Sequence, residues 1–277
     1  MQRSFQPVMT SIVLTAAMLL AAGQAFGSVI GYSITSSDDL VTVDLMTGTT
    51  TTIGTLGVDG DYEGLAFSPL GTLFAFEDNG QDLYTINITT GAATLVGNSG
   101  VDVSNSGLSF RSDGTLFLTV DGGVEGLYTL NTSTGAATLV GNYPSDPRIS
   151  AIAFRNDGTL FGINPEDDEL VTINTSTGAL TTVAPLSIIL GEGSQQGLDF
   201  DASGTLYLMS ESLDGVYTVD TGTGLLTLSV SLPDGTESFA IPKTVIPEPS
   251  SLALSGFGVL MLAGYGWRRR RKTLLNH

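Results

Sequence analysis

Short apolar runs separated by turn residues recur along the chain with a period in the low forties. The three clearest copies are GLAFSPLGTLFAFEDNGQDLYTINITTGAATLVGN, GLSFRSDGTLFLTVDGGVEGLYTLNTSTGAATLVGN and AIAFRNDGTLFGINPEDDELVTINTSTGALTTVAP, and a fourth reads GLDFDASGTLYLMSESLDGVYTVDTGTGLLTLSV. The equivalent phenylalanines are spaced 43, 44 and 46 residues apart, at Phe67, Phe110, Phe154 and Phe200. Four short apolar runs per copy predict a four-stranded antiparallel sheet, the blade of a β-propeller.

The turn between the third and fourth runs has the same pattern in every copy: Asn or Asp, two residues, Thr and Gly. It occurs at Asp44 to Gly48, Asn87 to Gly91, Asn131 to Gly135, Asn174 to Gly178 and Asp220 to Gly224. The final glycine supplies the positive φ that a hairpin loop with a bulge needs. Three of these turns also match a glycosylation sequon, and we favour the turn interpretation. Recurring aromatics on the second and third runs are predicted to pack between blades.

The two ends of the repeat array predict how the ring closes. Residues 28–57 contain runs two, three and four of a blade but have no first run. The segment from Thr236 to Ile241 resembles the missing run and follows the last complete copy. Supplying it from the C-terminal side removes the exposed sheet edges of an open array. We therefore predict an all-β, five-bladed propeller of four-stranded blades over residues 28–245.

The first 27 residues have the layout of a secretory signal peptide. Arg3 precedes an apolar run from Ile12 to Ala22, and the small residues Ala25 and Gly27 follow it. Cleavage is expected after Gly27, with cleavage after Ala25 as the alternative. A retained membrane anchor is less favoured, because the apolar run is shorter than the roughly 20 residues that a spanning helix needs.

The C-terminal residues 246–277 have the pattern of a membrane-spanning segment with a basic tail. Residues 251–267 contain no charge, and as a transmembrane helix they would span about 25 Å. Trp267 takes the place of an interfacial aromatic residue, and the cations that follow should stay on the cytoplasmic side. This membrane stop comprises Trp267, Arg268, Arg269, Arg270 and Arg271, with Lys272 next.

The same end resembles the PEP-CTERM sorting signal of Gram-negative bacteria. The resemblance rests on Pro247, Glu248 and Pro249, followed by a short hydrophobic helix and an arginine cluster. It implies that exosortase, a membrane protease or transpeptidase, recognises the tripeptide. It also implies an association with exopolysaccharide, biofilm or floc matrix. A plain membrane anchor with a chance Pro-Glu-Pro is the alternative.

Composition removes several kinds of chemistry. The chain has no cysteine, and its one histidine is the terminal His277. Thiolate nucleophiles, disulfides and histidine-dependent hydrolase triads are therefore not expected. The chain carries a net charge of -18, and residues 28–245 have 27 acidic residues against four basic ones. Such a domain is not expected to bind nucleic acid.

The acidic residues are not spread evenly over the predicted ring. The loops after the second run and the connections between blades share one face, and 21 of the 27 acids fall there. Three interpretations remain open. The charge keeps the protein soluble, it binds calcium through loop oxygens, or it provides paired carboxylates for glycoside hydrolysis. The calcium candidates are Asp59, Asp61, Glu63, Glu166, Asp167 and Asp168.

Together these features predict a secreted structural or binding module of an extracellular polysaccharide matrix, without enzymatic activity and without catalytic residues. The expected partners are exosortase, the membrane before processing, and polysaccharide or other surface proteins. No cofactor is expected apart from calcium under the second interpretation of the acidic face. The alternative is a carbohydrate-active enzyme that uses acids on one propeller face.

Overall fold

The computed structural model describes residues 28–143, 147–191, 195–233 and 235–243. The predicted signal peptide, the Pro-Glu-Pro tripeptide, the hydrophobic segment and the arginine cluster lie outside these residues, so those assignments and the domain boundaries stay predictions. Within the described residues, no helix is long and apolar enough to cross a membrane.

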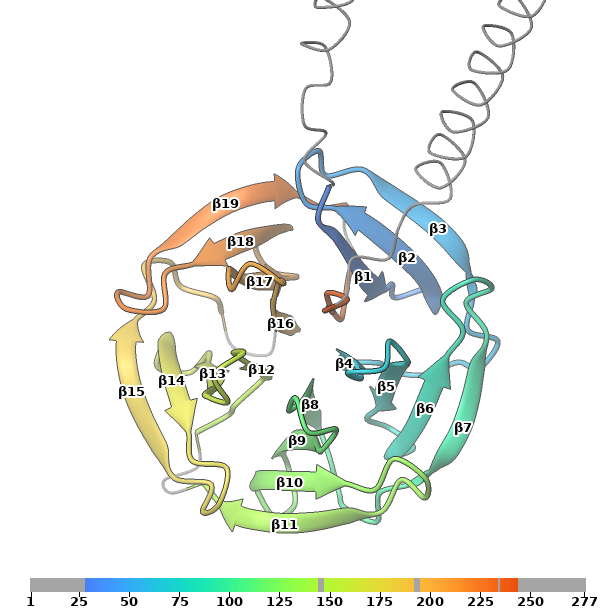
Figure 1. Cartoon of the computed structure of the whole chain (residues 1–277), viewed down its shortest axis with the longest axis horizontal. Helices are drawn as coiled ribbons and strands as arrows, with labels where there is room; N and C mark the ends of the chain where they lie inside the picture. Colours follow the sequence, from blue (N-terminus) through green and yellow to red (C-terminus); the bar gives the residue numbers. More distant parts are fainter. Residues whose placement is uncertain (1–27, 144–146, 192–194, 234, 244–277) are drawn as a thin grey trace, which may run out of the picture.

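Nineteen strands form five antiparallel sheets arranged around one axis (Figure 1). The first sheet contains β1 (Ile30–Ile34), β2 (Asp39–Asp44) and β3 (Thr50–Thr55). The second contains β4 (Gly64–Phe67), β5 (Leu73–Glu77), β6 (Asp82–Ile86) and β7 (Ala93–Asn98). The third contains β8 (Asn105–Phe110), β9 (Leu116–Asp121), β10 (Gly126–Leu130) and β11 (Ala137–Asn142). The fourth contains β12 (Ala151–Phe154), β13 (Leu160–Asn164), β14 (Glu169–Ile173) and β15 (Leu180–Pro185), and the fifth contains β16 (Gln196–Phe200), β17 (Leu206–Ser210), β18 (Gly215–Val219) and β19 (Leu226–Ser231).

The C-terminal segment completes the first blade, as predicted. Tyr32 and Ala240 exchange two backbone hydrogen bonds of 2.8 and 2.9 Å, and the N–H of Glu237 donates to the carbonyl of Ile34 at 3.0 Å. Phe239 is only 1% exposed and packs against β1 and β16 at Gly31 and Gly197. The five-bladed ring is therefore closed by residues 236–241 lying beside β1.

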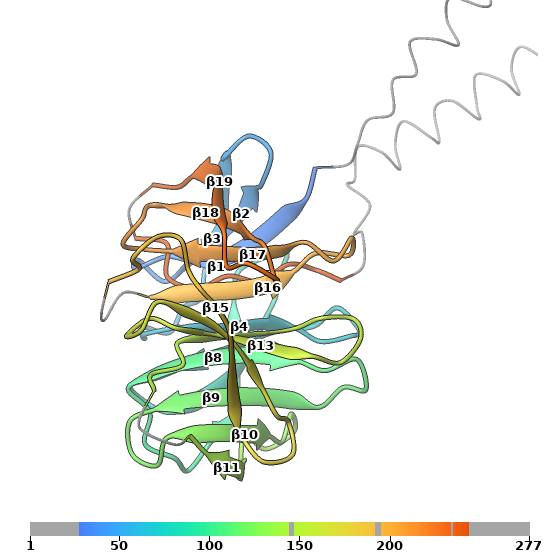
Figure 2. The same cartoon turned by 90° about the vertical axis from the view of Figure 1, so that its left-hand side faces the viewer.

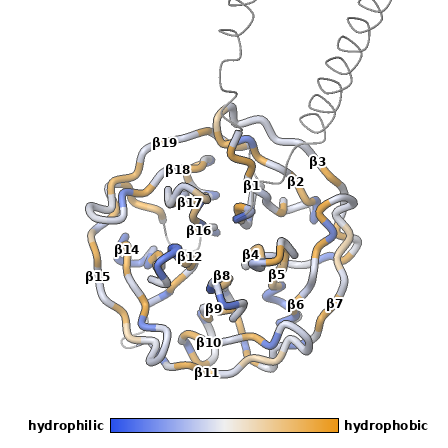
Figure 3. The backbone as a smooth tube through the Cα atoms, viewed as in Figure 1, coloured by the Kyte–Doolittle hydropathy of each residue, from blue (hydrophilic) through white to orange (hydrophobic). Residues whose placement is uncertain are grey.

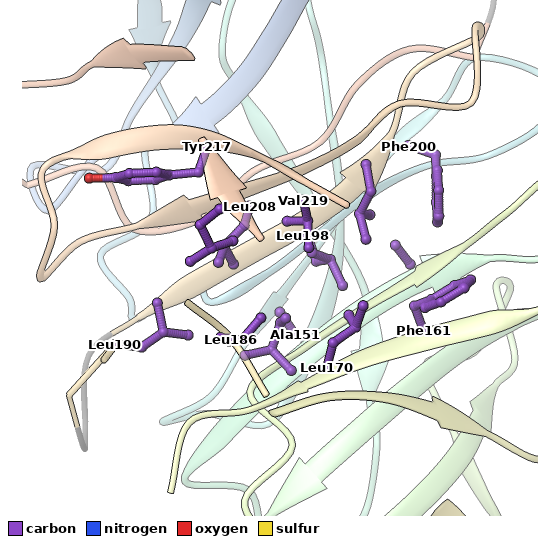
Figure 4. Packing of buried hydrophobic residues seen from close by; sticks show 14 residues of the cluster. Ala151, Phe161, Leu170, Leu186, Leu190, Leu198, Phe200, Leu208, Tyr217 and Val219 are labelled. Atoms are coloured by element: carbon purple, nitrogen blue, oxygen red, sulfur yellow. The ribbon is translucent and has the colours of Figure 1, made fainter. Parts of the chain in front are cut away.

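The hydrophobic core is divided into five clusters, one at each interface between neighbouring blades. Figure 4 shows one of them, in which Leu198 and Leu208 of the fifth blade face Ala151 and Leu170 of the fourth. Four interfaces repeat an aromatic pair with ring centroids 5.1 to 5.7 Å apart: Tyr32 with Phe67, Phe74 with Phe110, Phe117 with Phe154, and Phe161 with Phe200. The prediction that the recurring aromatics pack between blades is confirmed.

A second contact between blades depends on the predicted turn glycines. Gly135 has a φ of 79°, and a Cβ added there would lie 2.1 Å from the carbonyl oxygen of Gly97 in the preceding blade. The other turn glycines meet the preceding outer strand in the same way. These pairs are Gly91 with Gly54, Gly178 with Gly141, Gly224 with Pro185, and Gly48 with Ser231. The turn interpretation of the sequons is also supported, because the side-chain oxygens of Asn87, Asn131 and Asn174 accept backbone N–H groups of their own turns.

The ring has two chemically different faces, which lie on opposite sides in Figure 2. We call one the mouth face. It consists of the loops after the second strand of each blade and the connections between blades. The other, the base face, consists of the turns between strands one and two and between strands three and four. Hydrophilic residues recur close to the central axis as well as on the loops (Figure 3).

Candidate functional site

Five equivalent positions surround the axis where the innermost strands begin on the mouth face. We call them the mouth ring: Glu63, Ser106, Ser150, Gln196 and Glu237. Each directly precedes a small residue of the innermost segment of its blade, at Gly64, Gly107, Ala151, Gly197 or Ser238. All members of the ring are buried except Glu237, which is partly exposed. Every blade therefore contributes one polar side chain to the mouth-face end of the central channel, the space around the axis of the ring.

The small residues after the ring bring the innermost strands close together. A Cβ added at Gly107 would lie 2.8 Å from the Cα of Ala151, and one added at Gly197 would lie 2.4 Å from the Cβ of Phe239. Leu65, Leu108 and Leu198 line the channel just below the ring. The cavity that they share with Glu63 has a volume of about 10 Å³, close to the minimum that holds one water molecule. This cavity therefore has no room for a ligand larger than water.

Two carboxyl groups of the second blade share one serine of the third. The Oγ of Ser106 donates to Oδ1 of Asp78 at 2.6 Å, and the N–H of Ser106 donates to Oε2 of Glu63 at 3.2 Å. Asp78 follows β5, whereas Glu63 precedes β4, so the hairpin of β4 and β5 brings the two acids to the same end. Asp78 is 3% exposed and Glu63 is 8% exposed.

An amide from the fifth blade reaches the same acids. Nε2 of Gln195 donates to Oδ1 of Asp61 at 2.9 Å and to Oε1 of Glu63 at 3.2 Å. Asp61 also donates its backbone N–H to Glu77, whose carboxylate accepts from Asn79 and Gly80 as well. Glu77 therefore fixes the loop that carries Asp61, while Gln195 links the fifth blade to the second across the mouth. Acids and amide from different blades thus converge at one point.

The cluster holds protons more tightly than ordinary carboxyl groups. Burial, followed by the charge of Asp61, raises the pKa of Glu63 to about 7. Burial and the charge of Glu63 raise the pKa of Asp78 well above its usual range, although the bond from Ser106 opposes this. Burial and the charges of Asp61, Glu211 and Asp38 raise the pKa of Glu237 to about 7. The mouth can therefore hold protonated acids beside carboxylates at neutral pH, the pairing that general acid–base chemistry uses.

Several buried oxygens at the mouth have no hydrogen-bond partner within the described protein. They are Oδ2 of Asp78, Oε1 of Gln195, Oδ1 of Asn105 and Oγ of Ser150. Buried polar atoms are normally satisfied, so unpartnered ones point to a group from outside the chain, a buried water molecule or a ligand. The amide oxygens of Gln195 and Asn105 accept hydrogen bonds, whereas a hydroxyl or a protonated carboxyl can also donate, so a hydroxyl-bearing group, which does both, complements them.

The structure gives the calcium hypothesis no support. Within the residues that it describes, no group of three or more acidic or histidine side chains is placed to hold a metal ion. In the first predicted loop Asp59 is exposed, whereas Asp61 and Glu63 share Gln195. In the second loop, Glu166 pairs with Arg148, Asp167 accepts from Asn164, and Asp168 accepts the N–H of Leu190.

The described cations lie mostly away from this cluster. Arg148, on the mouth face, has its Nε 3.5 Å from Asp121 and 3.6 Å from Glu166. The other three cations lie on the base face and pair with acids of that face: Arg111 with Asp113, Arg155 with Asp157, and Lys243 with Asp199. The mouth face consequently keeps a large negative excess.

Sequence reasoning assigned Asp78 and Glu237 to the acidic face without singling them out, and it missed Gln195. Glu63 was named only as a calcium candidate. The signal that could have found the cluster is the position directly before the small residue of each innermost segment, which is polar in every blade. Aligning that position across the repeats predicts a polar ring. The alignment does not show that Asp61 and Gln195, which lie outside this position, contact the ring.

The comparisons with known proteins concern the tail and the fold. The family model of the PEP-CTERM protein-sorting motif matches residues 245–271. No curated protein matches the sequence. A gluconolactonase from Xanthomonas campestris has a similar structure, with a TM-score of 0.49 and 19% identity over 76% of this chain and 79% of that one. A virginiamycin B lyase from Staphylococcus aureus has a TM-score of 0.47 and 14% identity over 77% and 75% of the two chains.

These similarities correct one prediction. We predicted from the sequence that the propeller is not an enzyme, and the solved structures contradict this, because those with similar folds include a gluconolactonase and a lyase. The identities are too low to transfer either activity. The sorting motif, in contrast, is confirmed, and it implies export, sorting to the cell surface and processing by exosortase. The chain is a five-bladed β-propeller protein that carries a C-terminal PEP-CTERM sorting motif.

Proposed function

We propose that this exported propeller binds a hydroxyl-rich ligand, a saccharide of the extracellular matrix, above its mouth ring. The observation that supports this most is the convergence of Asp61, Glu63, Asp78 and Gln195 at one point. Vicinal hydroxyl groups of a sugar donate pairs of hydrogen bonds, and carboxylate and amide oxygens accept them.

The cluster has an outer and an inner layer, and only the outer layer is placed to touch a sugar. Asp61, Gln195 and Glu237 are partly exposed, whereas Glu63 and Asp78 lie beneath them. Glu63 accepts a hydrogen bond from Gln195 at 3.2 Å, and the backbone N–H of Asp78 donates to the carbonyl of Asp61 at 2.9 Å, so each inner acid holds an outer group. Glu63 and Asp78 are therefore positioning residues, and Asp61, Gln195 and Glu237 are the contact residues.

Calorimetry of the purified domain against a panel of polysaccharides and their oligosaccharides tests binding. Replacing Asp61 with asparagine should weaken binding by about tenfold, the usual cost of a charge-assisted hydrogen bond. Glu169→Gln is the matched control, because Glu169 lies on the same face but contacts Thr182 of the outer strand. Equal affinity for both variants would refute the site, and no binding to any saccharide would refute the proposal.

A second candidate is cleavage of the bound saccharide or of an ester on it by acid–base catalysis. The specific observation in its favour is that Glu237, a partly exposed group, has a pKa raised to about 7. An acid with such a pKa can donate a proton at neutral pH. Release of new reducing ends or free acid from the panel, abolished by Glu237→Gln, would establish catalysis. If the unaltered domain and the Glu237→Gln variant both bind the saccharide and neither releases product, the domain binds its ligand without cleaving it.

A further inference from the structure

The propeller begins on its base face. The carbonyl of Val29 accepts a 2.9 Å hydrogen bond from the N–H of Leu45. Leu45 belongs to the turn that joins β2 to β3, which is one of the base-face turns. The predicted signal peptide therefore precedes the ring at the face opposite the mouth.

The propeller also ends on its base face. The ammonium group of Lys243 donates to the carbonyl of Phe200 at 2.6 Å and to the carboxylate of Asp199. Phe200 is the last residue of β16, where the turn to β17 begins on the base face. Oδ2 of Asp199 also accepts the N–H of Ile241 at 2.8 Å. These bonds hold the last described residues of the chain under the ring.

The link from this point to the sorting signal is short. Pro247 comes four residues after Lys243, and the uncharged segment begins at Ser251. At about 3.5 Å per residue, the extended chain reaches at most about 14 Å to Pro247 and about 28 Å to Ser251. A hydrophobic segment seated in a bilayer therefore holds the base face close to the lipid surface.

The charge distribution of the propeller favours the same orientation as the short link, with the base face toward the lipid. On the mouth face, Arg148 is the one cation among the described residues, against an excess of acids. The base-face cations Arg111, Arg155 and Lys243 are each paired with an aspartate. Anionic lipid headgroups repel negative charge within about a Debye length, roughly 10 Å. They consequently repel the mouth face much more strongly than the base face.

We infer that, before exosortase acts, the propeller stands on the phospholipid surface with its base face down and its mouth ring pointing away. The base is held there by the short link and not by lipid binding of its own. The mouth ring of the precursor then faces the outside, whether or not it binds a saccharide. This inference rests on the sorting motif, on the position of the chain ends and on the predicted insertion of residues 251–267 into the membrane, and not on the proposed saccharide binding.

Single-cysteine variants test the orientation cleanly, because the chain has no cysteine. Thr132→Cys places a thiol in a base-face turn, and Val124→Cys places one in the mouth-face loop of the same blade; both native side chains are exposed. The full chain is produced in cells that lack exosortase and reconstituted into vesicles of phosphatidylethanolamine and phosphatidylglycerol. The measured quantity is the rate of labelling by a bulky polyethylene-glycol maleimide, relative to the same protein in detergent.

We expect the vesicles to slow labelling of the Thr132→Cys protein several-fold and to leave the Val124→Cys protein unchanged. Inserting a flexible linker of about 30 Gly and Ser residues after Lys243 should abolish the difference, because such a linker spans about 30 Å on average. Equal protection of both thiols, protection of the mouth thiol alone, or protection of neither would overturn the inference. Failure of the chain to float with the vesicles would overturn it too, without affecting a saccharide-binding result.

Discussion

Gln195 and Asp61 are separated by 134 positions in the sequence, yet Nε2 of Gln195 donates a 2.9 Å hydrogen bond to Oδ1 of Asp61. The same nitrogen lies 3.2 Å from Glu63. One amide of the fifth blade therefore holds two acids of the connection into the second blade. This contact across the mouth positions the outer acids on which the proposed ligand site depends.

The buried acids should make the domain less stable as the pH rises. The pKa of Glu63 is about 7 in the folded protein, against 4.5 for an ordinary glutamate. A group whose pKa is raised by folding contributes stability that is complete below its unfolded pKa and is lost as the pH rises through its folded pKa. We expect the free energy of unfolding to fall by on the order of 3 kcal/mol between about pH 5 and pH 8.

Urea unfolding at several pH values measures this fall. Glu63→Gln should flatten the profile between those pH values, whereas Glu169→Gln should keep it. Glu237 shifts in the same direction as Glu63, so some slope will remain in the Glu63→Gln protein. The pKa values of Asp113 and Asp157 are lowered by their arginine partners, and their effects fall in more acidic solution. A profile that rises with pH would contradict the assignment.

The contact between turn glycines and neighbouring blades should be essential to stability. Gly135→Ala forces a Cβ to within 2.1 Å of the Gly97 carbonyl at a positive φ. Gly114→Ala is the matched control, since Gly114 has a φ of 89° but nothing within 4 Å of its added Cβ. We expect the control to lose about 1 kcal/mol from its backbone conformation and Gly135→Ala to lose at least about 3 kcal/mol. Equal losses in thermal or urea unfolding would show that the blade contact adds nothing.

The buried carboxylate of Asp199 should be needed to close the ring. Asp199→Ala leaves the N–H of Ile241 without its acceptor and the ammonium of Lys243 with only the Phe200 carbonyl, which should cost about 2 to 4 kcal/mol of unfolding free energy. At the equivalent position of β8, Oγ of Ser109 accepts the N–H of Phe154 at 3.1 Å. Asp199→Ser should therefore recover part of the loss in urea unfolding. No difference between the alanine and serine variants would argue against the backbone contact.

The closing segment should mark the end of the folded domain. A chain that ends after Thr244 retains every described contact of residues 236–243, so its melting temperature should match that of the domain with its tail. A chain that ends after Gly235 loses Phe239 from the core and exposes the edge of β1. We expect it to aggregate or to unfold at a much lower temperature. Calorimetry and light scattering distinguish the outcomes, and a stable monomer lacking residues 236–243 would refute closure by this segment.

The fold was predictable because its cause is local and repeated. The spacing of Phe67, Phe110, Phe154 and Phe200 gives the blade, and the incomplete first copy together with the segment at Thr236 gives the number of blades and their closure. Hairpin strands adjacent in sequence pair with each other in every blade. The assignment of acids to one face followed from the same alternation of loops.

The candidate site was less predictable because its members come from unrelated positions. Asp61 and Glu63 were visible as an acidic loop, but the sequence alone suggested calcium for them. Nothing in the repeat shows that Ser106 and Gln195 donate hydrogen bonds to the carboxylate oxygens of these acids instead. The prediction of a protein without enzymatic activity relied on the missing cysteine and histidine, and it is contradicted by the enzymes among the similar solved structures.

The sequence by itself determined the five blades, their closure, the acidic face and the sorting motif, because short-range alternation and fixed spacing encode all of them. Only the tertiary structure decided which acids meet. Their convergence depends on the close approach of innermost strands at Gly64, Gly107 and Gly197 and on the ring bringing the second and fifth blades to one axis. The raised pKa values of Glu63 and Glu237 follow from that burial and proximity, which no single repeat contains.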